Sequence, residues 1–162
     1  MSKHTLTPQG DFPVATLGRR LAAMFYDFLL CTALLICTAG LYKMVQMAII
    51  GEERMRTLTE SGALDGDPLL STVLLFVLFG FFAKFWTWSG QTLGMQVWCV
   101  RVQNPDGTAI SLWQALLRFV VSIASLLCLG LGFFWVLVDK QKRSWHDIYS
   151  DTCVVRVPKK KK

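Results

Sequence analysis

Three long runs of apolar residues, separated by polar segments, dominate the pattern of hydrophobic and polar positions along the chain. They extend over Leu21–Tyr42, Leu69–Trp88 and Trp113–Val138. About 20 apolar residues in a helix cross the hydrocarbon core of a bilayer, so each run has the length of a membrane span. The first run follows a polar arm and is longer than the apolar part of a signal peptide, so we interpret it as a retained helix. The pattern predicts an all-α membrane protein with two transmembrane helices and a third helical segment.

The third apolar run contains the sequence LGLG, Leu129–Gly132, near its middle. Glycine weakens a helix at such a position. The run therefore either breaks and returns to the side from which it entered, or crosses the membrane as a simple third span. Charge favours the first alternative, because Lys and Arg concentrate in cytoplasmic segments. Positive residues are dense on both sides of the apolar runs, at Arg19, Arg20, Lys140, Lys142, Arg143, Arg156 and Lys159–Lys162. We expect a broken or re-entrant third segment, with both termini in the cytoplasm.

A β element is predicted between the second and third apolar runs. The stretch Met95–Gln103 is rich in β-branched and aromatic residues, which favour strands. It is followed by NPDG at Asn104–Gly107, which has the residues of a tight turn. The tail stretch TCVVRV, Thr152–Val157, also has strand character. We expect a small cytoplasmic β-hairpin, which the tail stretch joins to form a small sheet.

Composition agrees with a membrane protein and narrows its partners. Of the 162 residues, 53% are hydrophobic, and the mean hydropathy is +0.43. The formal net charge is +6. Because the positive residues flank the apolar runs, we assign them to topology and to anionic lipid headgroups near the basic tail, and not to nucleic acid. The five cysteines show no C-x-x-C spacing, so we expect no disulfide, metal or cofactor.

A few charged residues lie within the apolar runs or at their ends. With both termini inside, all of them would lie at the cytoplasmic end of the membrane segments: Arg20, Asp27, Lys84, Arg118 and Asp139. An ionised carboxylate at the centre of a membrane helix costs about 2.5–3.5 kcal/mol. Asp27 follows Arg20 by two helical turns, so Arg20 is one candidate partner for it, and Arg118 is the other. Such a cluster either fixes how the helices pack or lets Asp27 titrate or bind a cation in a transport path.

Four motifs stand out along the chain: RLAAMFYD at Arg20–Asp27, GQTLGMQVWCVRV at Gly90–Val102, LGLGFFW at Leu129–Trp135 and VDKQKRSWHD at Val138–Asp147. Together they resemble the RDD family of small bacterial membrane proteins, named for one arginine and two aspartates. The resemblance implies a multi-pass protein of the bacterial inner membrane. It also implies one RDD-type domain over residues 1–162, with a flexible N-terminal arm (1–16) and a basic tail (156–162). The second aspartate of the family corresponds to either Asp139 or Asp147.

The resemblance and the intramembrane charges lead to two functional hypotheses. Some RDD members have been linked to cation/proton exchange, which implies an oligomeric exchanger of Na⁺, K⁺ or H⁺, since three segments are too few to enclose a path. The alternative is a non-catalytic scaffold or accessory subunit, bound to its own copies or to another membrane protein, whose charges hold the helices together. The candidate residues are Arg20, Asp27, Arg118, Asp139 and Asp147, with Lys84 and His146 secondary.

An enzymatic function is not expected, because the sequence offers no nucleophile–base set. His146 and Asp147 are residue types that take part in acid–base catalysis. Adjacent residues do not face each other on a helix, however. We interpret them as a structural pair that caps a turn after the third segment or binds a lipid headgroup.

Overall fold

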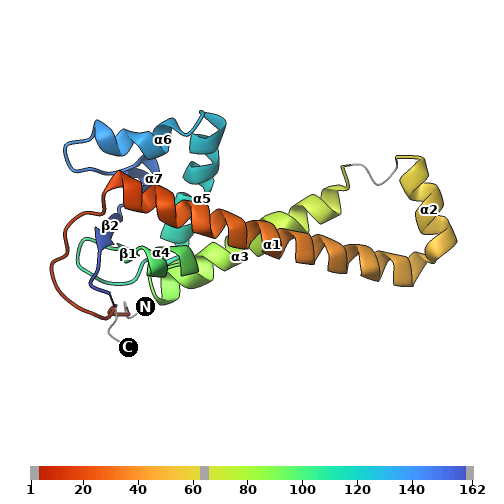
Figure 1. The fold of residues 1–162 in the computed structure, drawn as a ribbon, viewed down its shortest axis with the longest axis horizontal. Coiled ribbons are helices and arrows are strands. Elements are labelled where there is room, and N and C mark those ends of the chain that lie inside the picture. Colours follow the sequence, from red (N-terminus) through yellow and green to blue (C-terminus); the bar gives the residue numbers. More distant parts are fainter. Residues whose placement is uncertain (1–3, 63–65, 160–162) are drawn as a thin grey trace. The chain divides into compact units, whose positions relative to one another are not determined.

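The computed structural model describes residues 4–62 and 66–159, and most of its elements are helices (Figure 1). In chain order the elements are α1 (Leu17–Ile50), α2 (Glu52–Glu60), α3 (Pro68–Trp88), α4 (Leu93–Val97), β1 (Val100–Gln103), α5 (Leu112–Leu127), α6 (Leu131–Phe134), the 3₁₀ helix η1 (Trp135–Leu137), α7 (Trp145–Tyr149) and β2 (Cys153–Arg156). Contacts divide the chain into two compact units. Residues 29–80 form one, and residues 1–28 with 81–162 form the other, which we call the site unit.

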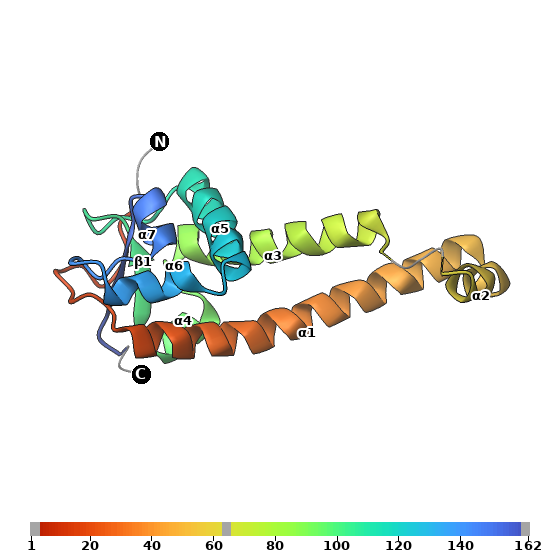
Figure 2. The ribbon, with the colours of Figure 1, turned by 90° about the horizontal axis from the view of Figure 1, so that it is seen from above.

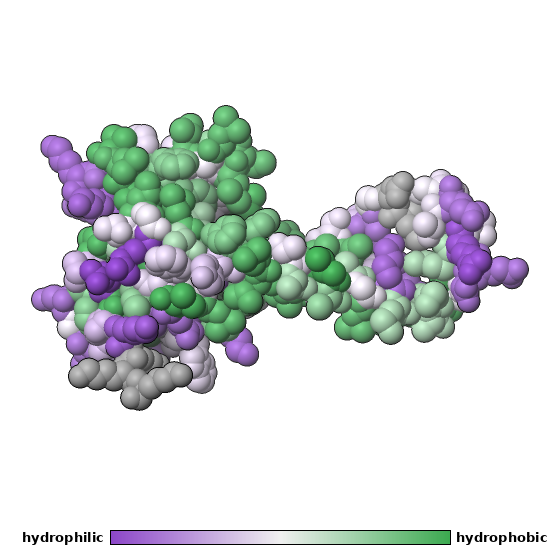
Figure 3. Space-filling view, viewed as in Figure 1, coloured by the Kyte–Doolittle hydropathy of each residue, from purple (hydrophilic) through white to green (hydrophobic). Residues whose placement is uncertain are grey.

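Two helices, α1 and α3, are long and apolar enough to cross a membrane, which confirms the prediction for the first two runs. They contain 34 and 21 residues. Large apolar side chains such as Phe28, Ile36 and Phe76 are exposed on them. Apolar side chains also cover much of the surface over α5 and α6, whereas hydrophilic ones gather over α2 (Figure 3). Exposure of apolar surface on this scale is typical of a chain whose helices face lipid.

Within the 29–80 unit, Asp67 fixes the start of α3 against α1. Tyr42 Oη donates a hydrogen bond to Asp67 Oδ2 at 2.8 Å, and Gln46 Nε2 donates to the same oxygen at 3.3 Å. Asp67 Oδ1 accepts from the backbone N–H of Leu69 at 2.9 Å, as an N-cap does. Both spans of this unit are therefore joined at one carboxylate.

The third apolar run is broken, as the glycines predict. α5 and the α6–η1 pair meet at 109°. Two successive residues in the break, Leu129 and Gly130, have positive φ angles of 55° and 78°, so the backbone leaves the helical path there. Gly132 permits a close approach, because a Cβ atom on it would lie 2.8 Å from Trp145 Cε3. Figures 1 and 2 show that the break folds α6 back beside α5 and α7.

The small sheet exists, but the predicted hairpin is wrong. β1 pairs antiparallel with β2 from the C-terminal tail, from Val100 opposite Arg156 to Gln103 opposite Cys153. The NPDG turn forms, with Gly107 N–H donating to Asn104 O at 2.9 Å. No strand returns from it, because Ser111 already caps α5 and leaves too few residues. The start of the predicted strand is instead the short helix α4, which Thr92 caps.

The segment before α1 lies beside the C-terminal strand, so segments from the two halves of the sequence meet in the site unit (Figure 1). Val14 forms an isolated β-bridge with Val155. Ala15 N–H donates to Val154 O at 3.0 Å, and Arg156 N–H donates to Pro13 O at 2.8 Å. β2 is therefore hydrogen-bonded along both of its edges, by β1 on one side and by the N-terminal segment on the other.

Candidate functional site

A fully buried carboxylate, Asp147, joins two arginines from two different helices. Its Oδ2 atom lies 2.6 Å from Arg20 Nη1 of α1, and its Oδ1 atom lies 2.7 Å from Arg118 Nη1 of α5. Oδ2 also accepts from the backbone N–H of Ser144 at 3.1 Å, as the reciprocal half of a capping box at the start of α7. We call Arg20, Arg118 and Asp147 the RDR cluster. It ties α1, α5 and α7 together at a single point.

The two arginines of the RDR cluster are held by further acceptors. Arg20 Nε donates to Ala15 O at 3.1 Å, and Arg20 Nη2 donates to Lys142 O at 3.1 Å. Arg118 donates to the hydroxyl of Thr152, and its guanidinium lies 5.3 Å from the ring centroid of Trp86. Two arginines face one aspartate, so the buried cluster keeps one positive charge in excess. Carbonyl dipoles and an aromatic face offset that charge.

The electrostatics of the RDR cluster fix the protonation of its acid. Burial alone would raise the pKa of the Asp147 carboxyl, but the positive charges of Arg118 and Arg20 outweigh burial and hold this pKa far below its usual range. Asp147 is therefore ionised at every physiological pH. A permanently ionised group held by two cations is suited to fixing structure and not to binding and releasing protons.

His146 lies next to the RDR cluster and is largely buried. Its Nε2 atom is 2.9 Å from Ser144 Oγ, and its ring packs 5.0 Å from that of Phe133. Burial, helped by the nearby arginines, lowers the pKa of His146 to about 3. The ring is thus neutral at pH 7. Its distance of 3.8 Å from Asp147 Oδ1 leaves no hydrogen bond between the two side chains.

We expect the stability of the protein to fall as pH drops from 7.5 to 5, and His146 to cause most of that fall. The unfolded chain takes up a proton near pH 6.5, whereas the folded ring takes it up only near pH 3. Below pH 6.5 the unfolded state therefore binds more protons, and stability declines by up to about 1.4 kcal/mol per pH unit. Thermal unfolding of purified protein in detergent measures this. H146Q should flatten the dependence, whereas H4Q should not; equal dependence in H146Q and wild type would contradict the assignment.

Asp27 is buried on α1, and the predicted arginine partners are wrong. The hydroxyl of Thr92 donates to its Oδ2 atom, and the backbone N–H of Gly94 donates to its Oδ1 atom at 2.9 Å. Arg20 does not reach it, because side chains on a helix point back toward the N-terminus. Arg20 accordingly bonds to Ala15 O instead. All hydrogen-bond donors to Asp27 among the described residues are neutral groups.

The turn that leads into α4 docks against Asp27. Thr92 is the N-cap of this helix and also accepts from Met95 N–H at 3.2 Å. Gly94 lies so close to α1 that a Cβ atom on it would sit 2.9 Å from Asp27 Oδ1 and would collide with the carbonyl oxygen of Ala23. The glycine and threonine of the GQTLG segment therefore let its backbone dock directly on the first membrane helix.

The two remaining predicted residues, Asp139 and Lys84, belong neither to the RDR cluster nor to the group around Asp27. Asp139 accepts from the backbone N–H of Arg143 at 2.9 Å and lies 3.3 Å from its Nε atom. The hydrogen bond from that N–H, which outweighs the opposing effect of burial, lowers the pKa of Asp139. Lys84 is exposed on α3. Arg20 and Arg118 thus meet through Asp147, whereas no hydrogen bond or ion pair within the described chain joins Asp27, Lys84 or Asp139 to them. That all five charges lie at one level of the membrane stays a prediction.

The sequence analysis missed the polar residues that complete the RDR cluster and the surroundings of Asp27. Thr92 donates a hydrogen bond to Asp27, Thr152 accepts one from Arg118, and Ser144 is the N-cap of the helix that carries Asp147. A signal existed for one of them, since Ser144 and Asp147 have the S-x-x-D spacing of a capping box. Among residues 4–62 and 66–159, no group of three or more His, Cys, Asp or Glu side chains could hold a metal ion. Within the described chain, none of the five cysteines forms a disulfide.

The fold and site define a helical membrane protein whose first helix is joined to its C-terminal part through a buried arginine–aspartate cluster. The model of the RDD family matches residues 14–151, and the chain belongs to this family. Comparison with curated proteins and with solved structures gave no match.

Proposed function

We propose that the protein exchanges a monovalent cation for a proton across the bacterial inner membrane, with Asp27 as the group that binds them in turn. One observation carries the proposal. Asp27 is a buried carboxylate on a membrane helix, and its hydrogen-bond donors are a hydroxyl and an amide. An acid inside the membrane that no cationic side chain neutralises is suited to binding a proton or a metal cation as its counter-charge.

The contrast with Asp147 supports the choice of Asp27. Arg20 and Arg118 supply the counter-charge of Asp147 permanently, so a mobile cation would have to compete with both. Asp27 has no such competitor among the described residues. The RDR cluster then serves as the fixed frame, and Asp27 as the exchanging group.

The proposal includes an oligomer and an orientation. Two spanning helices and one bent pair are too few to enclose a path, so we propose that several copies associate through their exposed apolar faces. The pairing of the N-terminal segment with β2 supports both chain ends on one side of the membrane. The excess of Lys and Arg near those ends supports the cytoplasmic side. No catalysis is part of the proposal.

Loss of flux in D27N is the expected result. Purified protein is placed in liposomes that hold a pH-sensitive dye, and pulses of Na⁺ or K⁺ are applied. Asparagine keeps the shape and can still hydrogen-bond to Thr92 or Gly94, but it cannot bind a proton or balance a cation, so the response should drop to the level of empty liposomes. D151N is the matched control, because Asp151 is exposed and its φ of 50° suits asparagine. A wild-type response unchanged in D27N would contradict the assignment of Asp27.

The RDR cluster favours a second candidate, a membrane scaffold or accessory subunit. All three charges of the cluster are engaged within the chain, as expected of charges that hold helices together. Under this alternative Asp27 only anchors α4. Folded wild-type protein would then give no cation-dependent response at all, and D27N would lose assembly or accumulation instead of flux.

A further inference from the structure

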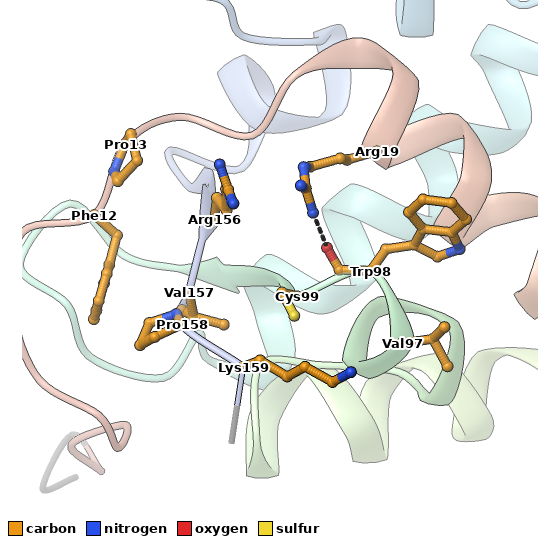
Figure 4. Close-up of a pocket in the computed structure, with 10 residues that line it drawn as sticks. All are labelled: Phe12, Pro13, Arg19, Val97, Trp98, Cys99, Arg156, Val157, Pro158 and Lys159. Carbon is orange, nitrogen blue, oxygen red and sulfur yellow. Dashed lines mark hydrogen bonds between the residues drawn. The ribbon is translucent and has the colours of Figure 1, made fainter. Parts of the chain in front are cut away.

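A positively charged pocket opens beside the first turn of α1, and neither Asp27 nor any member of the RDR cluster lines it. Its volume is about 680 Å³. Three cationic side chains reach it from two segments: Arg19 from the first turn of α1, and Arg156 and Lys159 from the C-terminal segment (Figure 4). Phe12 and Trp98 supply aromatic surface. None of the described residues that line the pocket is acidic.

The walls of the pocket are fixed by hydrogen bonds between distant segments. Val157 N–H donates to Cys99 O at 2.9 Å, which holds the C-terminal segment beside the end of α4. Arg156 N–H donates to Pro13 O at 2.8 Å, which holds the N-terminal segment on the opposite side. Arg19 Nη1 donates to Trp98 O at 3.1 Å and so is oriented from α1 (Figure 4). The arrangement exists before any ligand arrives, which reduces the entropic cost of binding one.

The positive charges of the pocket are available to a ligand. Within the described part of the chain, the side chains of Arg156 and Lys159 have no hydrogen-bond or ion-pair partner, and Arg19 uses one of its five N–H donors. Such a set of donors matches the oxygens of a phosphate group, to which guanidinium groups bind in a bidentate way and lysine as a point charge.

The position of the pocket indicates where that phosphate comes from. Arg19 belongs to the first turn of a helix that is long and apolar enough to span a membrane, so the pocket lies at the end from which this helix would enter the bilayer. Val97, in the wall of the pocket, is an exposed apolar side chain, and Leu93 one turn earlier on α4 is exposed as well. This combination of cations with apolar surface suits a phosphate that carries acyl chains. We propose that the pocket binds the phosphate of an anionic phospholipid headgroup. The proposal does not depend on cation exchange.

Binding of phosphatidylglycerol to the full-length protein in neutral detergent tests the pocket. Bound lipid is measured by native mass spectrometry, with phosphatidylcholine as the comparison lipid. We expect phosphatidylglycerol to bind at least about tenfold more tightly, and R156Q/K159Q to lose about tenfold in affinity, since each basic residue near an anionic surface strengthens binding several-fold. Both substituted side chains are exposed and without partners in the described chain, so folding should not suffer.

Control variants distinguish lipid binding in the pocket from a general effect of the protein's positive charge. R54Q/K140Q removes the same charge from exposed positions outside the pocket and should keep full affinity. R156K/K159R restores the charge and should bind like wild type. Glycerol 3-phosphate, which carries no acyl chains, distinguishes the sources of the phosphate. If it does not compete with phosphatidylglycerol, the lipid is supported as the ligand. Competition at equal concentration would overturn the need for acyl chains. Equal binding of both lipids, or equal loss in both charge-removing variants, would overturn the proposal.

Discussion

D147N should be severely destabilised, and little folded protein should accumulate in the membrane. The substitution leaves Arg20 and Arg118 buried without the carboxylate that faces both of them at 2.6 and 2.7 Å. Removing one partner of a buried ion pair costs about 3–5 kcal/mol, because the remaining charge is left uncompensated. Here one substitution strands two charges. The yield of monodisperse protein by fluorescence-detected size exclusion, and the thermal midpoint in detergent, measure the effect.

The matched control is again D151N, which changes the same chemistry at an exposed position and should behave like wild type. A double-mutant cycle identifies the mechanism. R118Q and D147N should each be destabilising, while R118Q/D147N should cost clearly less than their sum, since the double variant removes one cation together with the anion. Strict additivity of the two losses would mean that the pairing of the charges is not the cause.

G94A should detach the GQTLG turn from the first helix, and we expect it to lower the stability of the protein substantially, although less than D147N does. An added Cβ atom would collide with the carbonyl oxygen of Ala23 and lie 2.9 Å from Asp27 Oδ1. Neither atom can move cheaply, because one belongs to the backbone of α1 and the other belongs to a carboxylate whose second oxygen, Oδ2, accepts a hydrogen bond from Thr92. Overpacking of this kind costs about 1–3 kcal/mol. Loss of the Thr92 and Gly94 contacts would add to that cost, so the thermal midpoint should fall by several degrees.

Glycines that lie inside membrane helices provide the controls for G94A. A Cβ atom at Gly40 or Gly80 would meet nothing within 4 Å, so G40A and G80A should be neutral or slightly stabilising. Trypsin cleavage at Arg101, which is buried in β1 shortly after α4, gives an independent measurement, since detachment of the turn should expose this residue. An unchanged midpoint and unchanged proteolysis in G94A would show that α4 does not depend on this close approach.

Some features could be predicted because they depend only on neighbours in the sequence. The two spans follow from the length of their apolar runs, and the break in the third follows from glycines whose conformational freedom is local. The NPDG turn formed for the same reason. The partner of β1 did not follow, because its pairing with β2, 50 to 56 residues away in the sequence, depends on how the helices bring both strands together.

The candidate site shows the same division. Asp27 was recognisable as a buried acid because charge is rare in a membrane helix. Its partners were not, since a two-turn spacing places Arg20 on the same face but says nothing about where that side chain extends. Arg20 reaches back to Ala15 O and across to Asp147, whereas a turn from another part of the chain supplies Thr92. Side-chain direction and tertiary docking decided both pairings.

The span of the RDR cluster along the chain has a consequence for biogenesis. Arg20 lies at the start of the first membrane helix, and its carboxylate partner follows 127 residues later. During synthesis the first helix therefore reaches the translocon with an arginine whose counter-ion has not yet been translated. The cluster can close only after α7 leaves the ribosome, and the last strand then joins the first segment. Insertion of the helices and completion of the fold are separate events, and the second cannot begin until Asp147 has been translated.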